Sequence, residues 1–308
     1  MQNASFELFG LTIYKYGAFI TLGVLSALAL AYFSEKQKKL KAGSSLAAIV
    51  IALPLGLIFS RLLYCFTDAA FIPFISLKNV VNLHIGGMSM FGAILGVLLA
   101  TLIASKLIKA GTRSMLDAIV PPIMAFIFFE RLGERFTTLG ISRPLITGVL
   151  DNTFLVLKGE YDLYLKTWLL EAAAALILCI VLYNMLNKNK DDDVFLSWLL
   201  LFGASQAVFE SLRFDSHMRF SFVGVQQLLS AVFFGLSIIA FALKKRPLNL
   251  KAKISLALLP ISIIAVLGLE FLIDRSEISK WLLYAVYVAI LAANCALSLN
   301  LKKEANNG

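Results

Sequence analysis

The chain has 308 residues, of which 59% are hydrophobic and 15% are charged, and its formal net charge at pH 7 is +9. Soluble domains average about 45–50% apolar and about 25% charged residues, so this composition excludes an ordinary water-soluble globular protein. The positive charge does not indicate nucleic-acid binding, because the lysines and arginines fall in short loops between apolar segments. We therefore expect the partners to be membrane lipids and no nucleic acid.

Nine apolar segments predict membrane-spanning helices. A helix needs about 20 residues to cross a hydrocarbon core of about 30 Å, and in lipid its backbone must satisfy its own hydrogen bonds. The expected fold is all-α, a polytopic membrane helical bundle with about seven core transmembrane helices in residues 1–243. Residues 244–308 are expected to form a C-terminal extension with two further transmembrane helices. The predicted spans are residues 11–33, 45–66, 86–107, 116–132, 166–186, 194–212, 222–243, 254–273 and 281–300.

The loop charges predict which side of the membrane each loop faces. Most lysines lie in the tail and in the loops after the first, third, fifth and seventh spans, whereas the longer opposite loops hold fewer. Because basic loops stay in the cytoplasm, we expect the N-terminus outside and the C-terminus in the cytoplasm. The start of the chain lacks the features of a cleaved signal peptide, so the first span is expected to be retained. The long loops at residues 68–83 and 134–166 would then form a small outer cap.

Several charged residues lie toward the predicted outer ends of the spans. A charge at membrane depth costs at least about 2.5–3.5 kcal/mol on insertion scales, so it normally faces a cavity or a partner. Two interpretations stay open: the arginines bind the phosphate of a lipid through paired hydrogen bonds, or they reach the interface or pair with carboxylates as structural support. The residues are Arg61, Glu130, Arg131, Glu134, Arg135, Glu171, Glu210 and Arg213.

A run of glycines marks the start of the third predicted span. Gly86, Gly87, Gly92 and Gly96, with Ser89 among them, remove side chains so that another helix or a ligand can approach closely. Tight helix packing explains this spacing, and a lipid pocket against a glycine-lined wall is the alternative.

The order of these motifs resembles the bacterial prolipoprotein diacylglyceryl transferase family over about residues 8–243. The resemblance implies an enzyme of lipoprotein biosynthesis that moves diacylglyceryl from phosphatidylglycerol to the thiol of a lipobox cysteine at the outer face of the plasma membrane. The matching segments are Lys15-Tyr16-Gly17, Ser60-Arg61-Leu62-Leu63-Tyr64, Gly86-Gly87-Met88-Ser89 with Gly92 and Gly96, Asp117 and Pro121 followed by Arg131-Leu132-Gly133, Leu170-Glu171-Ala172, Glu210 with Arg213, Asp215 and His217, and Gln227-Leu228-Leu229-Ser230.

The resemblance also implies roles for single residues, with no cofactor and no metal. Arg131 and Arg213 would hold the phosphate, and Tyr16 would help to shape the pocket. Glu134 is either a proton acceptor or a partner that neutralises Arg131 or Arg135. The expected partners are phosphatidylglycerol and a prolipoprotein signal peptide with its lipobox cysteine. The candidate catalytic residues are therefore Arg131, Arg213 and Glu134, and the candidate substrate-binding residues are Tyr16, Arg61, Gly86, Gly87, Ser89, Gly92, Glu171, Glu210 and Gln227.

The sequence also departs from the family pattern. The signature histidine of the family falls on Phe91, which carries no proton, and Glu134 replaces the asparagine of an Arg-x-Gly-Asn motif. An alternative function is therefore a catalytically altered homologue that acts as a phospholipid-binding or assembly protein of the membrane. Glu270, in the C-terminal extension, and His217 are expected to be interfacial residues, with proton transfer the alternative for His217.

Overall fold

The computed structural model describes residues 5–8, 11–83, 86–145, 150, 152–159, 161–188, 193–214, 218–220, 223–244 and 247–306. Asp215 and His217 of the family-like motif lie outside these residues. Within the described part of the chain, eight helices are long and apolar enough to cross a membrane. The protein is therefore a multi-pass helical membrane protein, as the composition predicts.

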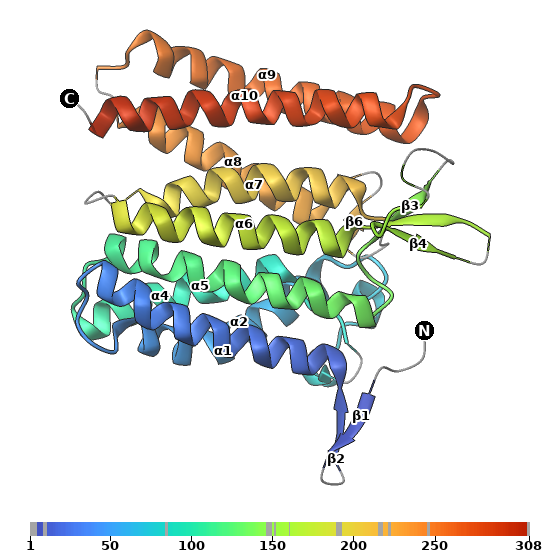
Figure 1. The fold of residues 1–308 in the computed structure, drawn as a ribbon, viewed down its shortest axis with the longest axis horizontal. Coiled ribbons are helices and arrows are strands. Elements are labelled where there is room, and N and C mark those ends of the chain that lie inside the picture. The colour runs from blue at the N-terminus through green and yellow to red at the C-terminus, as the bar shows by residue number, and fades with distance from the viewer. Residues whose placement is uncertain are drawn as a thin grey trace. The chain divides into compact units, whose positions relative to one another are not determined.

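The helices follow the predicted spans closely, and short strands lie between them (Figure 1). The helices are α1 (Lys15–Gln37), α2 (Ser44–Thr67), α3 (Leu77–Val81), α4 (Met90–Ile108), α5 (Thr112–Gly133), α6 (Thr167–Lys188), α7 (Val194–Leu212), α8 (Val225–Leu243), α9 (Leu250–Arg275) and α10 (Lys280–Asn306), with 3-10 turns η1 (Ile72–Phe74) and η3 (Glu134–Phe136). The strands are β1 (Ser5–Leu8), β2 (Leu11–Tyr14), β3 (Ile141–Leu145), β4 (Val156–Lys158), β5 (Leu163–Lys166), β6 (Arg219–Phe220) and β7 (Val223–Gly224).

Two predicted spans begin four residues later than the sequence suggested. The first helix begins at Lys15, because the four residues before it pair as strand β2 with β1, with Ser5 opposite Tyr14. The third begins at Met90, because Gly86 and Gly87 have φ angles of 75° and 80°, which a right-handed helix does not allow.

The chain divides into two compact units, each with its own packing. The first comprises residues 1–66, 74–192 and 212–216, and the second comprises residues 67–73, 193–211 and 217–308. In the first unit α5 is central, since α1, α4 and α6 all pack against it. Residues Ala118 to Ala125 of α5 are buried, and so are its charged residues Asp117 and Arg131, which therefore face protein rather than lipid. Helix α5 has 22 residues and is not among the eight apolar helices.

The glycines of α4 allow this helix to lie directly against α2. A Cβ atom on Gly92 would lie 2.5 Å from the carbonyl oxygen of Phe59, and one on Gly96 would lie 2.5 Å from that of Leu55. Both clashes are with backbone, which cannot move aside. Close helix packing therefore accounts for the glycines at these two positions.

The long loop after α5 contains a sheet that the sequence analysis did not predict. Strands β3, β5 and β4 form a three-stranded antiparallel sheet with β5 in the middle. Figure 1 shows β3 and β4 near the beginning of α6. The sheet gives this part of the first unit a fixed framework beside the helix ends.

The second unit contains α8, α9, α10 and nearly all of α7. Gly203 brings α7 close to α8, because a Cβ there would lie 2.7 Å from the carbonyl oxygen of Ser230. Asn294 of α10 donates a hydrogen bond of 2.9 Å to Ser262 of α9. Buried apolar side chains from all four helices, including Phe234 and Leu283, form one hydrophobic cluster. Helices α9 and α10 are thus part of the packed core of the second unit.

Candidate functional site

The main polar feature of the first unit is a buried group of charged side chains from distant parts of the chain, which we call the arginine cluster. Arg131 comes from the last turn of α5, and Glu134 follows it in η3. Glu171 lies in α6, and Arg213 follows α7 directly. Glu130, beside Arg131 in α5, is the fifth member. The structure therefore brings together all three candidate catalytic residues and one candidate substrate-binding residue.

Two carboxylates each bridge both arginines, so that the four side chains form a closed ring. Glu134 Oε1 accepts hydrogen bonds from Arg131 Nη1 and, at 3.0 Å, from Arg213 Nη2, while its Oε2 accepts from Arg213 Nη1 at 3.2 Å. Glu171 Oε1 accepts from Arg213 Nη1 at 3.0 Å, and Glu171 Oε2 lies 2.9 Å from Arg131 Nε. Each of the four residues is at most 6% exposed. Burial of charge at this depth requires such pairing.

Glu130 borders the ring without bridging it. Its Oε2 lies 3.4 Å from Arg131 Nε, and its Oε1 accepts a hydrogen bond of 3.4 Å from the Tyr16 hydroxyl of α1. Its side chain is 14% exposed, against 5% for Glu134 and 0% for Glu171. With all groups ionised, two arginines face three carboxylates, and the cluster carries one net negative charge.

The electrostatics of the ring hold Glu134 in its ionised form. Burial by itself would raise the pKa of the Glu134 carboxyl, but the guanidinium charges of Arg131 and Arg213 and their hydrogen bonds outweigh it and lower that pKa below its usual range. A carboxylate of lowered pKa is a weak proton acceptor at neutral pH. This favours the interpretation of Glu134 as a charge partner of arginines. In the structure these arginines are Arg131 and Arg213, rather than Arg135.

The sheet of the long loop positions two members of the ring. Gly140 has a φ of 75°, and a Cβ there would lie 2.6 Å from Glu134 Oε2 and 2.8 Å from Trp168 Cβ, so only glycine fits. In β3, Ser142 forms a bridge with Arg213, and the Phe214 N–H donates to the Ile141 carbonyl at 3.0 Å. The segment that carries Arg213 is thereby fixed to the sheet.

Tyr16 and Gly133 show how closely α1 and α5 approach each other at the site. A Cβ on Gly133 would lie 3.0 Å from Phe19 Cβ and 3.1 Å from the Tyr16 ring. The predicted pocket residue Tyr16 therefore lies against the cluster.

Arg61 has a different environment from the other arginines. Its buried guanidinium donates to the backbone carbonyls of five residues, at 2.8 to 3.2 Å for four of them. The fifth bond goes to Gly86. The acceptors all lie in α3 and the segment after it: Asn79, Val80, Asn82, Gly86 and Gly87. Arg61 thus fastens this segment to α2.

The remaining glycine-motif residues organise the start of α4. Ser89 caps that helix by accepting from the Gly92 N–H at 3.2 Å, and its own N–H donates to Ser60 Oγ at 2.9 Å. The next residue, Met90, places its sulfur 2.9 Å from Arg131 Nη2. Phe91, which the sequence resemblance places at the family's signature histidine, is fully buried. The motif therefore borders the arginine cluster through Met90, a contact that nothing in the sequence indicated.

Glu210 and Gln227 belong to the second unit. Glu210 lies in α7 and is partly buried. Gln227, in the first turn of α8, donates hydrogen bonds to Glu270 of α9 and, at 3.3 Å, to the hydroxyl of Tyr287 of α10. Glu270, expected at the interface, is buried at 6% exposure, and neither it nor Tyr287 was among the candidate site residues. Its position 43 residues from Gln227 in the chain gave no local signal.

Comparisons with known proteins agree with the motif order. A family model described as prolipoprotein diacylglyceryl transferase matches residues 3–243. A phosphatidylglycerol–prolipoprotein diacylglyceryl transferase of Clostridium kluyveri is 30% identical over 255 residues, which cover 80% of this chain and 97% of that protein. Proteins of the same name from Clostridium novyi and Enterococcus faecalis are 24% and 26% identical, covering 78% and 82% of this chain and 94% and 93% of the relatives. The chain belongs to the prolipoprotein diacylglyceryl transferase family.

Proposed function

We propose that this protein transfers the diacylglyceryl group of phosphatidylglycerol to the thiol of a lipobox cysteine in prolipoprotein signal peptides. Membership of the family and the names of its relatives support both substrates. The observation that carries the proposal within the molecule is the pair of buried arginines joined by Glu134 and Glu171. Cations that are already held in place can stabilise the negative charge of a departing phosphate ester.

The chemistry assigns different tasks to the members of the cluster. The cysteine sulfur attacks the glyceryl carbon bonded to the phosphate oxygen, a thioether forms, the carbon–oxygen bond breaks, and glycerol phosphate leaves with the bond electrons. Arg131 and Arg213 orient the phosphate and stabilise its charge. The thiol proton must go to a base, since the thiolate is the effective nucleophile.

We assign the proton-accepting role to Glu130 rather than to Glu134. Glu130 does not bridge the arginines, and it is the most exposed of the three carboxylates. Glu134 and Glu171 instead act as counter-charges that keep the guanidinium groups in place when no lipid is bound. A phosphate that enters the site takes over part of the hydrogen bonding that Glu134 provides.

We also propose that the protein resides in a bacterial plasma membrane with the N-terminus outside and the C-terminus in the cytoplasm. Lys36 and Lys38 lie at the C-terminal end of α1, whereas Tyr16 and the arginine cluster lie at its other end. The positive-inside bias then supports a cluster that faces the outer leaflet. A periplasmic-type reporter fused after Asn306 is expected to be inactive, and an active one would overturn this orientation.

The decisive test of activity combines complementation with a direct assay. Expression in a transferase-deficient strain is expected to restore growth, and the purified protein with labelled phosphatidylglycerol and a lipobox peptide is expected to yield a thioether-linked product. Arg131→Ala should abolish the product, while Arg275→Ala, an exposed arginine at the end of α9, serves as the matched control. Absence of product, together with unchanged phosphatidylglycerol binding in Arg131→Ala, would refute the proposal.

A second candidate function is phospholipid binding or membrane assembly without turnover. It is favoured by Phe91, which is fully buried where the family has its signature histidine. The same assay separates the two functions. Stabilisation by phosphatidylglycerol in a thermal melt, with neither complementation nor product, is the result expected of the non-enzymatic protein.

A further inference from the structure

One nitrogen of the arginine cluster has an unusual hydrogen-bond acceptor. Arg131 is 3% exposed, and its Nη2 donates to the thioether sulfur of Met90 at 2.9 Å. The other two nitrogens of this guanidinium group face carboxylates: Nη1 donates to Glu134, and Nε lies 2.9 Å from Glu171 Oε2 and 3.4 Å from Glu130 Oε2. A thioether is a weak acceptor compared with a carboxylate or a carbonyl. The charged donor Nη2 is therefore buried without a strong acceptor in the contact that it makes.

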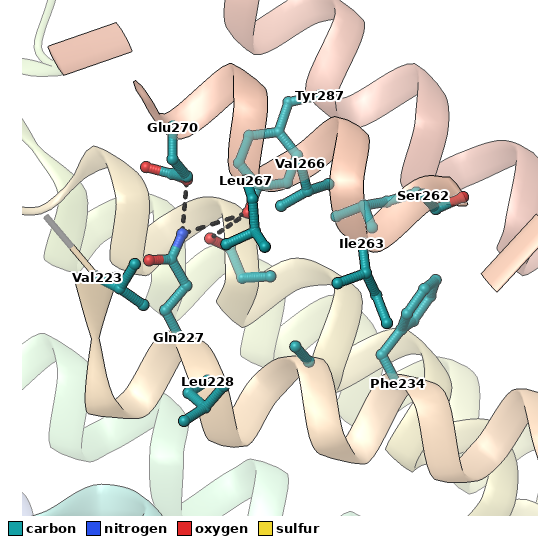
Figure 2. Close-up of a pocket in the computed structure, with 13 residues that line it drawn as sticks. Val223, Gln227, Leu228, Phe234, Ser262, Ile263, Val266, Leu267, Glu270 and Tyr287 are labelled. Carbon is teal, nitrogen blue, oxygen red and sulfur yellow. Dashed lines mark hydrogen bonds between the residues drawn. The ribbon is translucent and has the colours of Figure 1, made fainter. Parts of the chain in front are cut away.

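Other buried donors of the chain bond to oxygen. The guanidinium group of Arg61 donates to five backbone carbonyls. In the second unit, Figure 2 shows the Gln227 amide beside an apolar pocket, where it donates to Glu270 and, at 3.3 Å, to the Tyr287 hydroxyl. These donors have oxygen acceptors within the protein. The sulfur contact of Arg131 Nη2 differs from them, and it marks a place where a stronger acceptor can bind.

The shape of a guanidinium group makes Nη2 necessary for a two-point contact with phosphate. Two edges of the group present parallel N–H bonds, one formed by Nη1 and Nη2 and the other by Nε and Nη2. Phosphate oxygens accept paired hydrogen bonds from such an edge. Because both edges include Nη2, a phosphate that binds Arg131 at two points must take the place of the Met90 sulfur.

Met90 is placed and built so that it can move aside. It is the first residue of α4, directly after the cap Ser89, and it is only partly buried, in contrast to Glu134 and Glu171. Its unbranched side chain has three rotatable bonds, and it carries no charge. Moving it separates no ion pair, whereas moving Glu171 would leave buried arginines with less counter-charge. The positive end of the α4 helix dipole at this position also favours an anion nearby.

We propose that Met90 is a positioning residue of the phosphate site. Its sulfur holds Arg131 Nη2 in the empty protein, and the phosphate of phosphatidylglycerol displaces it on binding. This inference rests on the proposed function, since it takes that lipid as the ligand of Arg131. The phosphate competes with the carboxylate of Glu134 at Arg213 and with a neutral thioether at Arg131. The strength of the acceptor at position 90 therefore sets part of the lipid affinity.

Two substitutions of Met90 are expected to change the lipid affinity in opposite directions. Met90→Leu nearly keeps the volume but removes the acceptor, so the empty state loses a hydrogen bond that the bound state does not contain. Phosphatidylglycerol should then bind at least about threefold more tightly. Met90→Gln supplies an amide oxygen, which is a stronger acceptor, and should weaken binding at least about tenfold. Damage to the fold would weaken binding in both variants, so it cannot produce opposite signs.

Titration calorimetry with a short-chain phosphatidylglycerol in detergent measures these affinities. Leu107→Gln is the matched control, because it adds the same amide at a position that is 71% exposed, about 26 Å farther along α4, and it should leave the affinity unchanged. Unchanged affinity in both Met90 variants, or a change of the same sign in both, would overturn the proposal, as would a parent protein that does not bind the lipid. A parent protein that binds the lipid but forms no thioether product would refute the transferase function, and the affinities would still decide the role of Met90.

Nuclear magnetic resonance of isotope-labelled methionine methyl groups follows the displacement itself. The Met90 signal is the one missing from the spectrum of Met90→Leu. Saturation with phosphatidylglycerol is expected to shift this signal in the parent protein but not in Arg131→Ala. The signal of Met115, which lies at the other end of α5 from Arg131, should keep its position. A Met90 signal that bound lipid leaves unmoved would contradict the proposal.

Discussion

Glu134→Gln tests most directly whether the two arginines form a phosphate site. The substitution keeps the size of the side chain but removes one negative charge, so the net charge of the cluster changes from −1 to zero. Glu171 still bridges both arginines, and the variant should therefore fold. We expect a loss of stability of about 1–3 kcal/mol, the usual cost of an impaired buried hydrogen bond, rather than the cost of a charge with no partner.

The effect on lipid binding follows from the distances in the ring. Glu134 lies 3.0 to 3.2 Å from Arg213 nitrogens, so a phosphate on the same guanidinium group lies within about 6 Å of the carboxylate. At an effective dielectric constant of about 20, repulsion at that distance is about 3 kcal/mol, which corresponds to about 100-fold in Kd. Glu134→Gln should therefore bind phosphatidylglycerol about 100-fold more tightly.

Titration calorimetry with a short-chain phosphatidylglycerol in detergent measures this change. Glu7→Gln, which removes the same charge from an exposed position in β1, is the control and should leave the affinity unchanged. Turnover of Glu134→Gln should stay within about threefold of the parent protein if Glu134 is not the base. Unchanged or weaker binding in a folded Glu134→Gln protein would refute the phosphate site, and tighter binding with lost turnover would make Glu134 the base.

Three further predictions address other parts of the molecule. Glu130→Gln should lower turnover at least about 100-fold without weakening phosphatidylglycerol binding, as expected for a general base, and unaltered turnover would contradict that role. Gly96→Ala should lower the melting temperature in detergent, because the added Cβ collides with the Leu55 carbonyl. Gly268→Ala should not lower it, because that position has open space around it and alanine gains about 1 kcal/mol of helix propensity over glycine. Arg61→Lys should increase hydrogen exchange in residues 77–87, because a lysine ammonium group has too few donors for all the carbonyls that Arg61 contacts. Unchanged exchange would show that Arg61 is dispensable for that segment.

The helices could be predicted because length and hydropathy determine which segments cross a membrane. Their exact starts could not, since they depend on pairing with residues elsewhere: Tyr14 extends a strand with Ser5, and Arg61 holds the carbonyls of Gly86 and Gly87. The sheet after α5 escaped prediction because its strands are only three to five residues long. Such strands are stable only against the helices that support them.

The sequence singled out Arg131, Glu134, Glu171 and Arg213 separately, but it did not indicate most of the contacts among them. Arg131 and Glu134 are three residues apart and share one helix face, so their pairing follows from the sequence. That Glu171 and Arg213 close the ring depends on how α6 packs on α5 and on the bridge between Ser142 and Arg213. These contacts depend on tertiary packing, which cannot be inferred from residue spacing in a single sequence.

The ring leaves two routes by which a phosphate could reach the arginines, and pH distinguishes them. In one route a carboxylate becomes protonated and releases its arginines. In the other the carboxylate stays ionised and the phosphate displaces it. Because Arg131 and Arg213 lower the pKa of Glu134 below its usual range, this residue stays ionised from pH 8 down to pH 5.5, and its stabilising contribution is lost only at still lower pH.

Displacement is therefore the expected route for Glu134, which lies between Arg131 and Arg213 with Glu130 and Glu171 as the other charged members of the cluster. Glu134 should therefore contribute no pH dependence to phosphatidylglycerol affinity between pH 5.5 and 8, since neither Glu134 nor a phosphodiester changes charge there. A rise of tenfold or more as the pH falls would mean that protonation of a carboxylate of the arginine cluster admits the lipid. The same titration with Glu134→Gln then identifies the residue: a rise that disappears assigns the proton to Glu134, and one that persists assigns it to Glu130 or Glu171.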